Sequence, residues 1–320
     1  MNISIVIPTY NRVVFLKKIL INLIKFCPKN IKLEINICDS GSSDNTAYII
    51  RLYSNKRKNI NINYFNIKKN ILASKRNYGI LKSKYKNIIL LDDDCIPKKN
   101  FINEYVLEFK KNNDKIILCG IIEYDLRYLK KSPYLKFRNS RHFKKVDEKN
   151  LSPRFIVAMN MGFILNKKNK KILKFNENFI GYGFEDYEFG YRVQLQGFKL
   201  KKVNAKILHD EGIPDLAKFL IKHYHLGRDG MRNILKINKS AARNLIYYRI
   251  ENNLFFRFII ALPFIRYFLL FFEKIIIFLE KIKFLNLNFF YQMAKLCSYL
   301  RGFKDRLQVK NNQTSKNWYE

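Results

Sequence analysis

Three consecutive aspartates, Asp92, Asp93 and Asp94, follow four apolar residues at 88–91 that are typical of a buried strand. Three ionised carboxylates at one strand end repel one another, so a positive partner must neutralise them or their pKa values must rise. A Mg²⁺ ion that carries a phosphate-bearing ligand is an economical partner, because Mg²⁺ uses one or two carboxylates and completes its shell with phosphate and water. The alternative is that the aspartates only cap a helix after Pro97. This stretch alone leaves both interpretations open.

The elements that must position these carboxylates alternate between strand and helix. Strands are predicted at 3–7, 33–38, 60–65, 88–91 and 116–122, and helices at 13–26 and 73–81. This order predicts a largely parallel α/β sheet, whose ligands bind outside the carboxyl ends of the strands. Polar loops at 8–12, 39–44 and 92–94 lie at such ends, so we expect them to converge on one crevice. They contain no Gly-x-Gly-x-x-Gly or Walker sequence, which argues against dinucleotide-binding and P-loop proteins.

Further chemical groups follow in the second half of the predicted domain. A glycine-hinged loop at 175–186 ends in Glu185 and Asp186, and a helix is predicted at 187–196. The dipole of that helix favours the ionised form of Asp186, as a general base requires, whereas Glu185 is interpreted as a capping charge. His209 follows a strand predicted at 198–208 and is either a packing residue or a further ligand of the cation.

Two segments between these groups have weaker patterns. Residues 125–150 are basic and aromatic without a regular period, which predicts a mobile or substrate-facing insertion or an ordinary surface loop. A strand is predicted at 155–165.

The composition limits the partners and the compartment. The 320 residues carry a formal net charge of +35, which favours nucleic acid, anionic lipid or nucleotide sugars as partners. The abundance of Lys, Asn and Ile is also typical of an A/T-rich coding sequence, which explains part of the lysine excess. Five scattered cysteines without a Cys-x-x-Cys pair favour a reducing cytoplasm. The chain opens on a strand pattern instead of a signal peptide, so we expect its N-terminal part to stay in the cytoplasm.

Five sequence blocks, taken together, resemble the inverting family 2 glycosyltransferases. They are Ser4-Ile5-Val6-Ile7-Pro8-Thr9-Tyr10-Asn11-Arg12, Asp39-Ser40-Gly41-Ser42-Ser43-Asp44, Arg76-Asn77-Tyr78-Gly79, Asp92-Asp93-Asp94 and Gly181-Tyr182-Gly183-Phe184-Glu185-Asp186. The resemblance covers roughly residues 1–212 and is specific because all five blocks occur in the family's order. It implies a GT-A fold, which is an α/β architecture with a mostly parallel central sheet.

The resemblance also implies a reaction. A hexosyl or N-acetylhexosaminyl group would pass, with inversion, from a nucleoside diphosphate sugar to a hydroxyl of a glycan or lipid-linked acceptor. UDP sugars are the favoured donors, and bacterial surface polysaccharide or lipooligosaccharide synthesis is the implied setting.

Individual donor-site residues are carried over by the same resemblance. The implied donor-binding residues are Pro8, Thr9, Tyr10, Arg12, Asp39, Arg76, Asn77, Asp92 and Asp93. Tyr10 would stack on the nucleotide base and Asp39 would accept a hydrogen bond from it. Asp92 or Asp93 would contact the ribose.

The resemblance places the catalytic groups as well. Asp94 and His209 would hold Mg²⁺ or Mn²⁺ against the diphosphate, and Asp186 would be the catalytic base. The implied acceptor-side residues are Asn160, Gly162 and Glu185. Two positions depart from the family pattern: Phe184 stands where Trp or Gly often precedes Glu, and Cys95 replaces a frequent fourth acidic residue. Neither departure removes a group that the mechanism needs.

Residues after 212 lie outside these blocks. We predict a catalytic domain at 1–212, a helical, apolar and basic region at 213–310, and a flexible tail at 311–320. Residues 254–290 are strongly apolar, but charges interrupt every run before the roughly 18 apolar residues that predict a spanning helix. The charges at 266, 273 and 280, like those at 274 and 281, are seven apart and predict one narrow polar stripe on a helix. Pro263 predicts a kink or a division.

Two interpretations of this apolar region remain open. Its helices either lie in a membrane interface or pack on the catalytic domain or on a second subunit. The mixture of basic and aromatic residues favours the membrane, so we expect a protein that is peripheral on the inner face of the cytoplasmic membrane.

Three other functional classes fit parts of the sequence. A nucleic-acid-binding protein fits the charge but lacks a recognisable binding module. A nucleotidyltransferase of similar sheet would need a glycine-rich loop after the first strand, which 8–10 does not provide. A catalytically silent relative would not need Asp94 and Asp186.

Overall fold

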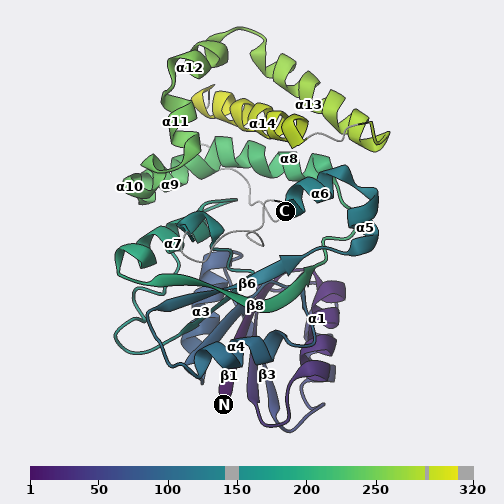
Figure 1. Cartoon of the computed structure of the whole chain (residues 1–320), viewed down its shortest axis with the longest axis vertical. Coiled ribbons are helices and arrows are strands. Elements are labelled where there is room, and N and C mark those ends of the chain that lie inside the picture. The colour runs from purple at the N-terminus through teal and green to yellow at the C-terminus, as the bar shows by residue number, and fades with distance from the viewer. Residues whose placement is uncertain (141–150, 285–287, 309–320) are drawn as a thin grey trace. The chain divides into compact units, whose positions relative to one another are not determined.

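The computed structural model describes residues 1–140, 151–284 and 288–308, which form two compact units (Figure 1). Of the described residues, the first unit contains 1–125, 151–177 and 189–211, and the second contains 126–140, 178–188, 212–284 and 288–308. Helix α7 (Glu185–Leu195) begins in the second unit and ends in the first. The predicted tail at 311–320 lies outside the described residues.

An eight-stranded sheet forms the centre of the first unit. Its strands are β1 (Asn2–Thr9), β2 (Lys32–Asp39), β3 (Ile60–Asn66), β4 (Asn87–Leu91), β5 (Cys95–Pro97), β6 (Ile116–Glu123), β7 (Asn160–Ile164) and β8 (Lys199–His209). Their spatial order is β3-β2-β1-β4-β7-β6-β8-β5. β1, β2, β3 and β4 run parallel, as do β6 and β8, whereas β7 is antiparallel to both neighbours and β5 to β8. The predicted mostly parallel α/β sheet is therefore confirmed.

Strand β7 is shorter than predicted. The prediction of a strand at 155–165 was wrong for its first five residues, because Pro153–Phe155 form a short 3-10 turn and pairing begins at Asn160. The neighbouring β4 has only five residues, and all five pair with Asn160–Ile164. A strand can extend only as far as a neighbour offers hydrogen-bonding groups.

Helices cover both faces of this sheet. The helices of the first unit are α1 (Val13–Phe26), α2 (Thr46–Tyr53), α3 (Leu72–Lys82) and α4 (Phe101–Phe109), together with the end of α7. Because side chains alternate along a strand, Ile5 of β1 packs with α1 and α4, while Val6 packs on the opposite face with α3. A Cβ on Gly79 of α3 would lie 2.3 Å from Val6 Cγ1, so only glycine permits this close approach.

The second unit is helical, as predicted for the C-terminal region. Its helices are α5 (Leu126–Lys131), α6 (Pro133–Ser140), α8 (Leu216–His225), the π-helical turn η4 (Leu226–Gly230), α9 (Met231–Ile237), α10 (Lys239–Arg243), α11 (Ile246–Asn252), α12 (Leu254–Ala261), α13 (Ile265–Lys281) and α14 (Asn288–Gln308).

The expectation of a patternless loop at 125–150 is corrected by α5 and α6. Tyr134 and Phe137 of α6 are buried in one apolar cluster with Leu220 and Tyr291, and this tertiary burial stabilises a helix that its sequence alone does not signal. Residues 141–150 of that segment lie outside the described residues.

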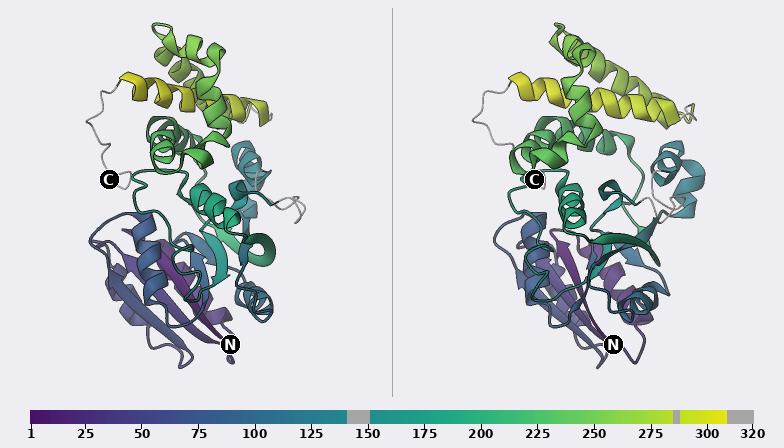
Figure 2. Two further views of the ribbon diagram at one scale, coloured as in Figure 1. Left: turned by 90° about the vertical axis from the view of Figure 1, so that its left-hand side faces the viewer. Right: turned by 60° about the vertical axis from the view of Figure 1, so that its left-hand side comes forward.

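Helices α13 and α14 run alongside each other within the second unit (Figure 2). Three polar residues of α13, seven apart, bond to α14: Arg266 to Asp305 at 2.9 Å, Glu273 to Arg301 at 2.9 Å, and Glu280 to the hydroxyl of Tyr291. The predicted stripe is therefore divided, because Lys274 and Lys281 are exposed instead.

Among the described residues, no helix meets the length and hydropathy expected of a membrane span by itself. Helices α12 and α13, which are bent by 99° relative to each other, meet these requirements only when taken as one pair.

Candidate active site

The loops that follow the carboxyl ends of β1 and β2 are hydrogen-bonded to each other. The backbone N–H of Asn11 donates to Ser42 Oγ at 2.7 Å, and Asn11 Oδ1 accepts from the N–H of Ser43 at 2.8 Å. Asn11 adopts a φ of 51°, a left-handed conformation that asparagine tolerates better than most residues. Asp44 then accepts from the N–H of Val13, the first residue of α1, at 2.8 Å. The loops at 8–12 and 39–44 thus converge, as predicted.

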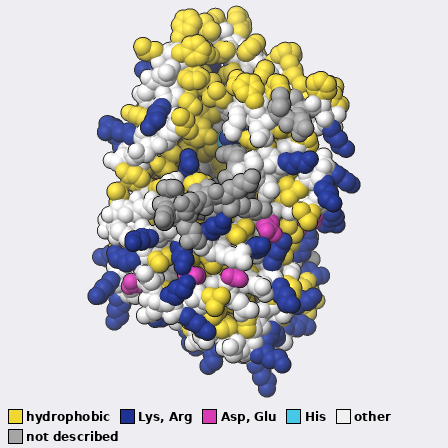
Figure 3. All heavy atoms as spheres, in the orientation of Figure 1, with side chains coloured by type: hydrophobic (Ala, Val, Ile, Leu, Met, Phe, Trp, Pro, Cys, Tyr) yellow, Lys and Arg dark blue, Asp and Glu magenta, His cyan; other side chains and the backbone are white. Residues whose placement is uncertain are grey.

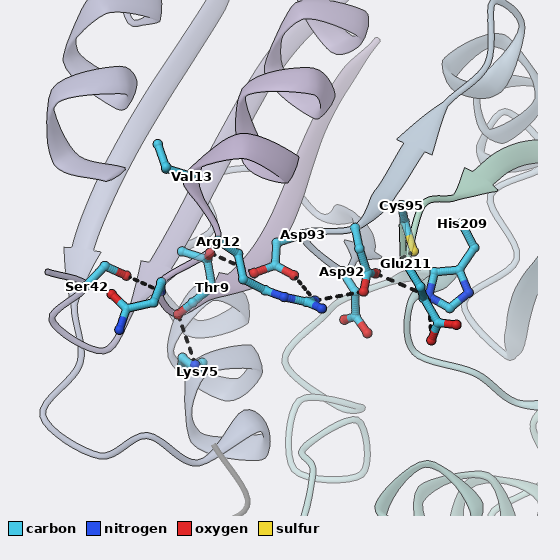
Figure 4. A network of polar contacts seen from close by, with 12 residues as sticks. Thr9, Arg12, Val13, Ser42, Lys75, Asp92, Asp93, Cys95, His209 and Glu211 are labelled. Carbon is cyan, nitrogen blue, oxygen red and sulfur yellow. Dashed lines mark hydrogen bonds and ion pairs between the residues drawn. The ribbon is translucent and has the colours of Figure 1, made fainter. Parts of the chain in front are cut away.

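The three aspartates lie beside these loops and are paired with two arginines. Figure 4 shows one of these arginines, Arg12, beside Asp93. Arg12 Nη1 lies 2.8 Å from Asp93 Oδ1 and 2.7 Å from Asp94 Oδ2, so one guanidinium bridges both carboxylates. Thr9 Oγ1 donates to Asp93 Oδ2 at 2.7 Å. Arg76 Nη2 lies 2.9 Å from Asp92 Oδ1. The predicted convergence of Thr9, Arg12, Arg76 and the three aspartates is therefore present in the fold.

The neighbouring carboxylates of Asp93 and Asp94 have opposite pKa shifts. Burial raises the pKa of Asp93 to about 6, although the charge of Arg12 opposes this. Burial would also raise the pKa of Asp94, but the charge and hydrogen bond of His209, together with Arg12, hold that pKa well below its usual range. Asp94 is therefore the more firmly ionised of the two, as a metal ligand requires.

Asp94, Cys95 and His209 form a group that fits a divalent cation. One potential ligand atom from each lies within 4.8 Å of the others. Antiparallel pairing of Cys95 in β5 with His209 in β8 brings them together, and His209 Nε2 lies 3.5 Å from Asp94 Oδ1 and 3.6 Å from Glu211 Oε1. The Nδ1 atom of His209 is buried, with no hydrogen-bond partner among the residues that the structure describes. Carboxylate oxygens suit Mg²⁺ and Mn²⁺, whereas the imidazole of His209 and the thiol of Cys95 are softer ligands.

Asp39 lies fully buried at the end of β2, next to the first loop. Its carboxylate accepts from Ser42 Oγ at 2.6 Å, from the N–H of Ser42 at 3.0 Å and from the hydroxyl of Tyr64 at 2.9 Å. Burial and this carboxylate raise the pKa of Tyr64 to about 12. A carboxylate has about four acceptor positions, so Asp39 has room for one more donor, such as a base N–H.

Lys75 is buried at the same carboxyl end of the sheet. Its Nζ donates to the carbonyl of Thr9 at 3.0 Å and to Asn70 Oδ1 at 2.9 Å, and lies 6.0 Å from the centre of the Tyr10 ring. Burial lowers its pKa to about 8, although Asp93 and Asp39 favour its charged form. Lys75 thus holds the segment from which Tyr10 projects.

Asn77 is hydrogen-bonded to the segment that contains Phe175 and Glu177. Its Nδ2 donates to the carbonyl of Phe175 at 2.9 Å and to Glu177 Oε1 at 2.8 Å, and its Oδ1 accepts from the N–H of Phe175 at 2.8 Å. Ser74 adds a bond of 2.7 Å to Glu177. Asn77 therefore positions this segment, and its direct contact with a nucleotide sugar stays a prediction.

Asn160 and Gly162 of β7 lie inside the first unit. Asn160 Oδ1 accepts from the hydroxyl of Tyr105 at 2.8 Å, and its Nδ2 donates to the carbonyls of Ile121 and Ala205. A Cβ on Gly162 would lie 2.6 Å from the Tyr105 ring. These contacts account for both residues as parts of the core, and nothing in the geometry adds to their predicted acceptor-side role.

Asp186 and Glu185 belong to the second unit, at the first turn of α7. The loop before them is strained: Gly183 has a φ of 107°, Phe184 has a φ of 70°, and a Cβ on Gly183 would lie 2.1 Å from Leu226. Phe184 packs edge-on against Tyr247 at 5.8 Å, which explains how an aromatic residue is kept at this position. Strain of this kind persists only where the surroundings hold it, and it is frequent at functional sites.

Sequence reasoning missed three residues of the site: Tyr64, Lys75 and Glu211. Tyr64 lies near the carboxyl end of β3, the same edge from which the other loops were predicted. Lys75 directly precedes Arg76, and Glu211 is the second residue after His209. Position at a strand end was thus an available signal for Tyr64 and Glu211, whereas the burial of Lys75 depends on tertiary packing.

The sequence of the chain is similar to two synthases of Pasteurella multocida. Chondroitin synthase of Pasteurella multocida (strain Pm70) is 28% identical over an alignment of 245 residues, which covers 66% of this chain and 25% of that protein. Hyaluronan synthase of Pasteurella multocida is 28% identical over 244 residues, with the same shares. The chain therefore spans about a quarter of the length of these relatives.

Solved structures share its fold. Mannosyltransferase PcManGT from Pyrobaculum calidifontis, in complex with GDP-Man and Mn²⁺, has a TM-score of 0.63 and 14% identity, covering 95% of this chain and 86% of that one. TarS 1-349 of S. aureus, in complex with UDP-GlcNAc, has a TM-score of 0.50 and 16% identity, covering 98% and 93%. The predicted GT-A fold is thereby confirmed.

The model of glycosyl transferase family 2 matches residues 4–173, more than half of the 320 residues. This range includes β1, the three aspartates and the Arg76-Asn77 pair described above. Together with the shared fold, the match confirms the resemblance found in the sequence: the chain belongs to glycosyl transferase family 2.

Proposed function

We propose that this protein is an inverting, metal-dependent glycosyltransferase that moves a sugar from a nucleoside diphosphate sugar to a hydroxyl of a glycan or lipid-linked acceptor. One observation carries the proposal: three strand-end loops of a family 2 chain bring Asp92, Asp93 and Asp94 together with Thr9, Arg12 and His209. Carboxylates, cations and a possible metal ligand at one sheet edge are the groups that a sugar diphosphate requires.

The nucleotide would be held by the edge of the sheet near β1 and β2. Tyr10 would stack on the base, Asp39 would accept the remaining hydrogen bond, and Lys75 would support the Tyr10 segment through the Thr9 carbonyl. Asp92, oriented by Arg76, would contact the ribose. Asp39, Lys75 and Asp92 are already held by other hydrogen bonds, which reduces the entropy lost when the donor binds.

Asp94 and His209 would hold Mg²⁺ or Mn²⁺, which when bound would stabilise the charge that develops on the departing diphosphate. In the structure Arg12 contacts the same carboxylate at 2.7 Å. Arg12 would therefore turn from Asp94 toward the diphosphate when a cation binds, and it would keep its contact with Asp93.

Asp186 would act as the general base. At the first turn of α7, the helix dipole favours its ionised form. Held about 3 Å from the acceptor hydroxyl, it would accept the proton as the oxygen attacks the anomeric carbon.

The relatives guide the choice of substrates and setting. By name, two of them make chondroitin and hyaluronan, and one structural neighbour is complexed with UDP-GlcNAc. We therefore favour a UDP sugar, hexosyl or N-acetylhexosaminyl transfer, and bacterial surface polysaccharide or lipooligosaccharide synthesis. Peripheral contact with the inner face of the cytoplasmic membrane through residues 254–290 is part of the proposal.

The test compares Asp186→Asn with its neighbour Glu185→Gln. A thermal-shift screen of nucleoside diphosphate sugars, with and without Mn²⁺, first identifies the donor. We expect Asp186→Asn to bind that donor normally but to lose sugar transfer by a factor of about 10² or more, because the hydroxyl keeps its proton. Because Glu185 is predicted to contact the acceptor and not to accept its proton, Glu185→Gln should raise the KM for the acceptor and retain most of kcat. Near-normal turnover by Asp186→Asn would refute the assignment of the base.

A further inference from the structure

An exposed apolar face covers one side of α12 and α13. On α13 and the residues that flank it, Phe264, Phe268, Phe271, Ile275, Phe278 and Ile282 recur at helical spacing, and the four phenylalanines are 60–77% exposed. On α12, Phe255 and Phe258 are 65% and 66% exposed. Hydrophobic side chains gather over this end of the second unit (Figure 3). A contiguous group of large, exposed apolar side chains is typical of an interaction site.

The opposite face of α13 is turned inward and combines buried apolar residues, Leu269 and Ile276, with paired charges. Glu273 is 3% exposed and receives two hydrogen bonds from Arg301, and Arg266 pairs with Asp305. Glu280 accepts from Ser132, from the N–H of Tyr134 and from Tyr291. An ordinary surface helix turns its charged residues outward, whereas α13 directs its paired charges toward its packed face and leaves phenylalanines exposed.

The charges that remain on the outside are all positive. The acidic residues between 254 and 284 are Glu273 and Glu280, and both have the inward contacts just described. The exposed charges of that segment are Arg257, Lys274, Lys281 and Lys283. A second copy of the chain would bring the same cations face to face, which disfavours self-association. An anionic lipid surface complements both the phenylalanines and the cations.

We infer that α12 and α13 lie as a bent helix pair within one leaflet of an anionic membrane. The phenylalanine face enters the acyl boundary, and Lys274 and Lys281 extend to the headgroups. At 1.5 Å per residue, the 17 residues of α13 measure about 26 Å, less than the roughly 30 Å of a hydrocarbon core, and α12 leaves at 99°. This inference deepens the membrane contact of the proposed function and does not depend on the sugar-transfer chemistry.

Vesicle flotation of the full chain tests the inserted face. Phosphatidylcholine vesicles with an equal part of phosphatidylglycerol are compared with phosphatidylcholine alone. The double variant Phe268→Ser and Phe271→Ser should reduce the partition coefficient on the mixed vesicles by a factor on the order of 10². The matched control, Tyr48→Ser and Leu107→Ser, removes two similarly exposed apolar side chains from α2 and α4 and should float like the unmodified chain. All variants should melt at the same temperature, since these side chains are exposed.

A charge variant tests the lipid specificity. Lys274→Gln with Lys281→Gln should weaken binding to the mixed vesicles by about fivefold per lysine and leave binding to phosphatidylcholine unchanged. Full flotation of the phenylalanine variant, or self-association without vesicles that this variant abolishes, would overturn the inference. Donor binding with Mn²⁺, measured by thermal shift, should be the same in every variant. Loss of flotation with donor binding retained separates this surface from the active site, and donor binding that fails in the unmodified chain would refute the proposed function alone.

Discussion

Buried carboxylates occur in both units, but the two units neutralise them differently. In the second unit Glu273 has an arginine of its own, since Arg301 contacts both of its oxygens at 2.9 and 3.0 Å. In the first unit Arg12 is divided between Asp93 and Asp94, at 2.8 and 2.7 Å. Burial raises the pKa of both Glu273 and Asp93, so the difference lies in how many carboxylates each arginine serves.

This difference separates a structural ion pair from a binding site. A carboxylate whose two oxygens are both held by one guanidinium offers little to a further cation. Two aspartates that share one guanidinium, with His209 and Glu211 nearby, can accept a divalent cation by releasing Arg12 from one of them. The candidate site thus leaves the charge of Asp93 and Asp94 only partly neutralised by Arg12. The pair of Glu273 and Arg301 is the fully neutralised comparison in the same chain.

Breaking the one-to-one pair should give the largest effect. Arg301→Met leaves Glu273 buried without its partner and should lower the free energy of unfolding by about 3–5 kcal/mol. The double variant Glu273→Leu and Arg301→Met should recover most of this loss, because no buried charge remains. Urea unfolding monitored by circular dichroism compares them, and equal stability of single and double variants would contradict the pairing argument.

Removing a ligand from the shared cluster should impair binding more than stability. Asp94→Asn should weaken Mn²⁺-dependent binding of the donor nucleotide by about 10²-fold or more, because the firmly ionised carboxylate is lost. Isothermal titration calorimetry measures this affinity. Asp210→Asn, at a nearby residue that pairs with Lys18, is the matched control and should bind normally. An unchanged affinity for Asp94→Asn would refute the metal site.

The buried lysine of the cluster predicts a pH dependence of stability. The folded pKa of Lys75 is about 8 and its ordinary value is 10.5, so between these values the unfolded chain binds more protons than the folded one. The free energy of unfolding should therefore gain a contribution of up to about 3 kcal/mol as the pH rises from 8 to 10.5. Lys75→Met should lack this rise. Parallel pH profiles for the two proteins would show that Lys75 is not buried as a cation.

The sharing of Arg12 between two aspartates predicts a smaller effect, on the stabilisation of the protein by a metal ion. Arg12→Leu removes the competitor for Asp94, so Mn²⁺ without nucleotide should raise the melting temperature by about 3 °C more in the variant than in the unmodified chain. Arg51→Leu, on the surface of α2, is the matched control and should show the ordinary shift. Equal shifts in all three proteins would indicate that Arg12 does not compete with the cation.

Much of the first unit could be predicted because its signals are local. Alternation of short apolar strands and amphipathic helices gave the parallel sheet, and Asp92 to Asp94 had to lie at a strand end. The family blocks extended this to Thr9, Arg12 and Arg76, which the fold brings to the same place. The helices α5 and α6 were not predicted, because their stability comes from burial of Tyr134 and Phe137 against residues distant in the sequence.

The sequence by itself determined the family and the chemical groups at the strand ends, because residue type and order are sufficient for both. Only the tertiary structure decided how each polar group is used. Asn160 faces Tyr105 inside the core, and Lys75 is buried beside Thr9. Of the stripe predicted on α13, only residues 266, 273 and 280 contact α14. A seven-residue period fixes which side chains share one face of a helix, but the direction of that face depends on the partners that packing supplies.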